Sequence, residues 1–191
     1  MRHFSIVLLI LLLSACGNES SPGEHNKNAT TEPVGVQETF PDTPGIIRTE
    51  IFNSSGRLTT IGYLLDGQKV GSWTDYTEEE RIHRLTNYLG GKKEGIYMEF
   101  NHANQLTLHC FYHNDKRHGK YVEYVQTRVK EERFYSNGKL EGVSRVYFPG
   151  GNLMEEGYYK DGLREGVSTW YDREGNKTLE YLYQKGELVK K

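Results

Sequence analysis

The stretch that decides the fold runs from Tyr158 to Tyr171 and reads YYKDGLREGVSTWY. It holds two glycines four residues apart, Gly162 and Gly166, with one aromatic pair before them and another after them. The second glycine of such a pair recurs along the chain, at Gly71, Gly95, Gly119, Gly142 and Gly166. These positions are separated by 24, 24, 23 and 24 residues, so the chain contains an array of short repeats.

Aromatic residues keep the same register as the glycines. Three residues before the first glycine of each copy, or before Asp115 where it replaces that glycine, come Leu64, Tyr88, Tyr112, Tyr135, Tyr159 and Tyr183. Five residues after the second glycine come Tyr76, Phe100, Tyr124, Tyr147 and Tyr171. The intervening residues alternate with a period of two, so that Ile96 and Met98 should share one face with Phe100. This alternation predicts β-strands.

Turn signals separate the expected strands. Asn137-Gly138 and Asp161-Gly162 supply the positive φ that tight turns require, and a second turn falls mid-repeat, as at Glu174-Gly175. Each repeat is therefore predicted to be one hairpin. The predicted fold class is all-β, a repetitive antiparallel β-hairpin meander forming one elongated sheet of about twelve short strands from Ile46 onward.

The repeat resembles a known family. Residues Tyr158 to Gly166, followed by Trp170 and Tyr171, are similar to the bacterial variant of the MORN repeat, and the resemblance covers about Ile46 to Lys191. It implies a MORN-like repeat domain over residues 46–191. Some arrays of this variant carry an antitoxin-like label, which implies a neutralising protein partner as one expected role.

The N-terminus has the layout of a secretory signal. A weakly basic start is followed by an apolar run to Leu13 that is too short to span a bilayer. Leu13-Ser14-Ala15-Cys16 then resembles the bacterial lipobox, which implies that residues 1–15 are a lipoprotein signal peptide and that Cys16 is lipidated. We therefore expect a lipid-anchored protein of the cell envelope, in the outer membrane if the organism has two membranes, because Gly17 and not Asp follows the cysteine.

Residues 16–45 are predicted to be the lipidated cysteine and a disordered tether. This segment is rich in Ser, Asn, Thr and Glu and holds four of the five prolines. Such a composition buries too little apolar area to offset the entropy of ordering. Beyond Cys16 the only cysteine is Cys110, so no intramolecular disulfide is expected in the mature chain.

Composition and motifs argue against several function classes. A net charge of −2 gives no basic surplus for nucleic acid. No nucleophile elbow or phosphate loop is present, so the sequence predicts neither an enzyme nor a cofactor. The carboxylates of Glu132, Glu156 and Glu180 should lie two strands apart, about 10 Å, which favours a solvated row over a glycosidase pair. A hydrolase that uses these glutamates is retained as an alternative.

A metal site is also considered and not predicted. Histidines and one cysteine are close in sequence, at His102, His109, Cys110, His113 and His118. Imidazole and thiolate are zinc ligands, but strand alternation turns Cys110 to the face opposite His109.

Two aromatic sets should lie on opposite faces. Phe100, Tyr124, Tyr147 and Tyr171 share a face with Ile96 and Val122, which predicts the packed side. The other set shares its face with carboxylates, which predicts an open partner-binding surface; its residues are Trp73, Tyr97, Tyr121, Glu99 and Glu123. Cross-strand stacking that stiffens the sheet is the alternative. The expected function is a non-catalytic protein-interaction or scaffold module, with a carbohydrate or cell-wall binder or an antitoxin-like protein as alternatives.

Overall fold

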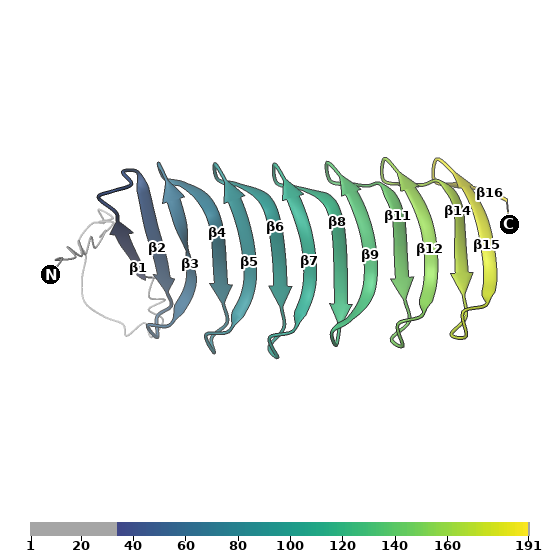
Figure 1. Ribbon diagram of the computed structural model, residues 1–191, viewed down its shortest axis with the longest axis horizontal. Coiled ribbons are helices and arrows are strands. Elements are labelled where there is room, and N and C mark those ends of the chain that lie inside the picture. Colours follow the sequence, from purple (N-terminus) through teal and green to yellow (C-terminus); the bar gives the residue numbers. More distant parts are fainter. Residues whose placement is uncertain (1–33, 191) are drawn as a thin grey trace, which may run out of the picture.

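The structure is a computed structural model that describes residues 34–190 and consists of one open antiparallel sheet (Figure 1). Neighbouring strands in space are neighbours in sequence, and β10 and β13 are short strands beside β9 and β12. The predicted all-β hairpin meander is thereby confirmed. The strands are β1 Val34–Thr39, β2 Ile46–Phe52, β3 Leu58–Leu65, β4 Gln68–Tyr76, β5 Ile82–Leu89, β6 Lys92–Phe100, β7 Leu106–His113, β8 Lys116–Val125, β9 Arg128–Ser136, β10 Lys139–Leu140, β11 Gly142–Tyr147, β12 Leu153–Lys160, β13 Leu163–Arg164, β14 Gly166–Tyr171, β15 Lys177–Gln184 and β16 Glu187–Lys190.

The sheet begins earlier than the sequence pattern predicts. β1 pairs antiparallel with β2, with Val34 opposite Phe52 and Thr39 opposite Ile47. The prediction of a disordered tether up to residue 45 is therefore wrong for this strand, since valines at alternate positions suffice once β2 supplies a partner edge. The expected signal peptide, Cys16 and the tether up to residue 33 lie outside the described residues.

Six hairpin tips have the same backbone geometry. Both central residues of each tip have positive φ, as in Asp161 (53°) and Gly162 (89°), which is the type I′ turn that matches the twist of paired strands. The tips are Asp66-Gly67, Gly90-Gly91, Asn114-Asp115, Asn137-Gly138, Asp161-Gly162 and Lys185-Gly186. Asp115 adopts φ of 65° where the other copies have glycine, so the copy that departs in sequence keeps the turn.

The single 23-residue interval has a structural cause in the turn between β8 and β9. In the regular repeat Phe100 pairs with Leu106, which leaves five residues for the turn. At the irregular position only four residues separate Tyr124 from Val129, and two of them, Val125 and Arg128, pair with each other, so the turn itself is Gln126-Thr127. The missing residue is therefore lost in a turn, and the strands that follow keep their register.

Hydrogen bonds also join each tip to the next. The backbone N–H of the first-glycine position donates to a carbonyl one repeat earlier, as from Gly91 to Lys69 (2.9 Å) and from Gly162 to Leu140 (2.9 Å). At the other ends of the strands, side-chain hydrogen bonds connect successive mid-repeat turns; for example, Arg57 Nη1 donates to the carbonyl of Glu78 (2.7 Å). Hydrogen bonds thus connect successive repeats at both ends of the strands.

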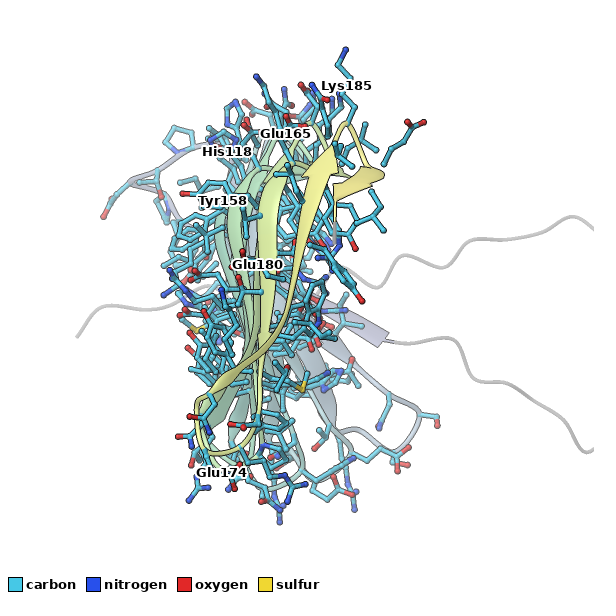
Figure 2. The ribbon with its side chains drawn as sticks, turned by 90° about the vertical axis from the view of Figure 1, so that its right-hand side faces the viewer. His118, Tyr158, Glu165, Glu174, Glu180 and Lys185 are labelled. Carbon is cyan, nitrogen blue, oxygen red and sulfur yellow. The ribbon has the colours of Figure 1, made fainter. Side chains whose placement is uncertain are left out.

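The sheet has two unequal faces, which Figure 2 shows nearly edge-on. We call one the ring face; on it Trp73, Thr86, Tyr97, Cys110 and Tyr121 lie directly opposite one another on successive strands. The other, the second face, carries the residues at the alternate positions. The most deeply buried cluster, formed by Tyr97, Cys110 and Tyr121, belongs to the ring face.

Candidate functional site

The structure corrects the predicted roles of the two faces. Trp73, Tyr97 and Tyr121, expected on an open surface, are only 4%, 6% and 4% exposed. The large exposed apolar side chains of the second face include Phe134, Tyr158, Val167 and Leu182. Phe100, Tyr124, Tyr147 and Tyr171, expected on the packed side, are half-buried.

The ring face is closed because large and small side chains alternate across its strands. Tyr97 lies between Thr86 and Cys110, and Tyr121 lies on the other side of Cys110. Each ring also meets a second ring edge-on, at centroid distances of 5.4 Å for Tyr97–Tyr112 and 5.6 Å for Tyr121–Tyr135. Edge-to-face pairs of this kind add about 0.5–1.5 kcal/mol to the free energy of area burial.

Cationic side chains lie over these ring pairs. Lys93 Nζ stands 5.3 Å from the Tyr97 centroid and 5.0 Å from that of Tyr112. Lys69 does the same for Trp73 and Tyr88, and Arg117 for Tyr121 and Tyr135. The chain's own cations therefore occupy the ring surfaces that a partner was expected to contact.

The predicted partner-binding carboxylates serve the buried phenols. The hydroxyl of Tyr97 donates to Glu99, and that of Tyr121 donates to Glu123. Glu123 also accepts from Lys130 Nζ at 2.9 Å, and the hydrogen bond from Tyr121 lowers the pKa of the Glu123 carboxyl. Burial, followed by the hydrogen bond to Glu123, raises the pKa of the Tyr121 phenol. All five predicted site residues thus belong to the packing of the ring face.

The carboxylate row of the retained hydrolase alternative lies on the second face and is paired with cations. Lys120 Nζ lies 2.7 Å from Glu132, Arg145 Nε lies 2.6 Å from Glu156, and Lys177 Nζ lies 2.8 Å from Glu180. The hydrogen bond from Lys120 lowers the pKa of the Glu132 carboxyl. A general acid needs the opposite shift, so Glu132 is not poised for acid catalysis.

The histidines and Cys110 separate as alternation predicts. Cys110 is 1% exposed on the ring face, where burial raises the pKa of its thiol to about 11. Within residues 34–190, no three His, Cys, Asp or Glu side chains are grouped so that they could hold a metal ion.

The sequence reasoning considered His113 and His118 only as zinc ligands and missed the residues that surround them. Glu94, Phe111, His113, His118 and Asn137 line a shallow depression near the hairpin tips of β6 to β9. His113 Nδ1 lies 2.9 Å from Glu94 Oε1, and the rings of His113 and His118 are 5.7 Å apart. The sequence did carry a signal, since His118 occupies the repeat position that holds glutamate in three other copies.

That repeat position has a defined task. The residue before the second glycine accepts the backbone N–H of the next hairpin tip, as Glu141 does from Asp161 (2.9 Å) and Glu165 from Lys185 (2.8 Å). Glu94 accepts likewise from Asn114 at 2.8 Å. His118 fills the role through Nδ1, 3.4 Å from the amide nitrogen of Asn137.

Comparison with known proteins adds no relative: no protein-family model matches the chain, and no curated protein does. The part of the chain from residue 34 to residue 190 contains no helix long and apolar enough to cross a membrane. The structure defines an all-β repeat protein whose ring face is closed around Trp73, Tyr97 and Tyr121 and whose second face is apolar and partly exposed.

Proposed function

We propose that this chain is a non-catalytic interaction module, held at the cell envelope by a lipidated Cys16, whose MORN-like sheet binds another protein through its second face. The observation that carries the proposal is an apolar band across the strands from β9 to β15. Its members and their exposed fractions are Phe134 41%, Tyr158 52%, Val167 48% and Leu182 37%.

Within the band, exposed side chains lie opposite apolar residues of the neighbouring strand. Val143 on β11 lies opposite Tyr158 on β12, and Val167 on β14 lies opposite Leu182 on β15. Five strands at about 4.8 Å spacing give it a length of roughly 19 Å. Tyr158 projects from the side of the sheet that also carries His118 (Figure 2).

The shape and charge of the band favour a protein partner. It is a flat strip, whereas small molecules are held in enclosed pockets that bury most of their surface. The flanking charges are already paired, as in Arg145 with Glu156, so apolar contacts would supply the affinity. Aromatic residues such as Tyr158 are frequent anchors of protein interfaces. The antitoxin-like role implied by the resemblance is one case of this proposal, with a toxin as the partner.

Site-specific photo-crosslinking in living cells tests the proposed surface. A crosslinking residue at position 158 or 182 should give one discrete protein adduct. The same residue at position 89 is the matched control, because Leu89 is also apolar and 67% exposed but lies at a hairpin tip away from the band. The same adduct pattern at all three positions would remove the case for the band.

The proposed anchor has its own test. Cys16→Ser should leave the protein unprocessed and without acyl chains, whose burial at about 0.8 kcal/mol per methylene supplies the proposed attachment. Metabolic labelling with a fatty acid reports this directly. Label that persists in the Cys16→Ser protein would contradict the proposed lipidation and leave the apolar band unaffected.

A further inference from the structure

The depression around His118 differs from its counterparts in the other repeats. Its two histidines depart from the repeat pattern: the next two copies have Glu141 and Glu165 in place of His118, and Ser136 and Lys160 in place of His113. The ring of Phe111 is kept in those copies, as Phe134 and Tyr158. Positions that recur in every copy serve the fold, so residues that depart from the pattern and gather around one hollow indicate a local task.

Hydrogen bonds fix the protons of the two imidazoles. The backbone N–H of Asn137 donates to Nδ1 of His118, so a neutral His118 ring carries its proton on Nε2. A neutral His113 ring that donates from Nδ1 to Glu94 keeps a free lone pair on Nε2. The depression therefore offers one donor, on His118, and one acceptor, on His113. Because Nε2 of His118 is protonated, it has no lone pair to offer a metal ion.

The other lining residues, Phe111 and Glu94, limit which ligands fit the depression. Phe111 is half-buried on the same face and supplies an apolar ring surface. Both carboxylate oxygens of Glu94 accept hydrogen bonds from the protein, one from His113 and the other from the backbone amide of Asn114, and the negative charge of this carboxylate disfavours an anionic ligand. A ligand that fits has an apolar face for the ring and uncharged hydroxyls for the imidazoles.

We propose that this depression binds a single pyranose unit of a glycan. The C–H groups of the sugar pack on Phe111, one hydroxyl accepts from His118 Nε2 and another donates to His113 Nε2. His113 and His118 are both exposed, so a sugar at the end of a chain or within it can reach them. The site lies beside the apolar band and shares no residue with it, so protein and glycan have separate determinants on one face.

The test is a titration of the full-length, detergent-solubilised protein, labelled with ¹⁵N-histidine, with the methyl glycosides of glucose, mannose and N-acetylglucosamine. Saturable shifts of the His113 and His118 ring signals are expected with at least one of the three. His118→Glu installs the repeat's own turn-capping residue, so the fold is kept while the donor is lost. It should weaken binding about tenfold, the equivalent of one net hydrogen bond.

Two further variants sharpen the result. Phe111→Leu should also weaken binding, because it removes the aromatic surface. Glu165→His is the matched control and should leave binding unchanged, since it places an imidazole at the same repeat position, beside the ring of Tyr158, but with Lys160 where the site has His113. Absence of saturable shifts with all three glycosides, or wild-type affinity in His118→Glu, would overturn the proposal. Crosslinking from position 158 should be the same in His118→Glu as in the wild type, so the glycan site and the protein-binding band are tested independently.

Discussion

The indole of Trp73 on β4 lies flat against the backbone of Gly62 on β3, so closely that a Cβ added to Gly62 would come 2.2 Å from the indole Cδ2. Trp73 Nε1 donates to the carbonyl of Tyr63 at 3.1 Å and holds the ring in this position. The ring face can therefore close at its N-terminal end only because residue 62 has no side chain.

Gly62→Ala should thus lower the free energy of unfolding by about 1–3 kcal/mol, the usual cost of overpacking a well-filled site. Gly35→Ala is the matched control, because its nearest neighbour would be the Glu50 carbonyl oxygen at 3.9 Å. Urea denaturation followed by circular dichroism measures both. Equal stabilities for the two variants would show that the Trp73 ring can move aside without cost.

Truncation of a ring should have opposite consequences on the two faces. Tyr121→Ala empties the buried cluster beside Cys110 and should cost about 3–5 kcal/mol, as core aromatic truncations do. Tyr158→Ala removes a ring that is 52% exposed, so it should change the unfolding free energy little while reducing partner crosslinking. A comparable loss of stability in both variants would contradict the distinction between a closed face and a binding face.

Cys110 should be inert toward thiol reagents in the native protein. Its pKa of about 11, against an ordinary 9.0, means that about one per cent is thiolate at pH 9 instead of one half. In a Cys16→Ser background, where it is the only cysteine, labelling by an aromatic disulfide should be slow until denaturant is added. Rapid labelling without denaturant would mean that the ring face opens readily.

The two buried phenols should make the fold sensitive to alkali. Burial, followed by the neighbouring carboxylates, raises the pKa of both Tyr97 and Tyr121. Because the folded-state pKa is raised, the unfolded chain ionises first, and stability falls as the pH rises above about 10, the ordinary value for tyrosine. Tyr121→Phe should be less stable at neutral pH but should lose less stability between neutral and alkaline pH. If the unfolding free energy of Tyr121→Phe falls with pH as steeply as that of the wild type, the loss of stability in alkali comes from groups other than Tyr121.

Whole repeats should be removable. Deleting residues 92–115 joins Gly91 to Lys116, which preserves the hairpin tip and the direction of every later strand. Deleting residues 92–105 removes one strand and its turn, so the strands that follow would have to run in reverse. Circular dichroism and thermal melting should show a cooperative fold in the first variant only, and two equally folded variants would contradict the nearest-neighbour architecture.

The fold was predictable because glycine spacing is a local signal, imposed by the positive φ of tips such as Asp161-Gly162. The closed face was not predicted, because alternation shows which residues share a face and says nothing of which face is covered. The missing information lay in the small residues opposite the rings, such as Gly62 and Cys110, and in cations such as Lys93 that lie over them. β1 was missed because six residues beside a proline-rich stretch carry too weak a pattern.

The hydrogen bonds between successive strands also determine how the molecule responds to a stretching force. β1 and β16 lie at opposite ends of the sheet, and its ladder hydrogen bonds run along the long axis (Figure 1). Tension between Val34 and Lys190 would concentrate on the few hydrogen bonds next to the two points of attachment, whereas the inner pairs of strands share the same load over a whole ladder of hydrogen bonds. The protein would then lengthen as its hairpins detach one after another, and loss of the N-terminal repeats would leave the strands from β9 to β15 paired.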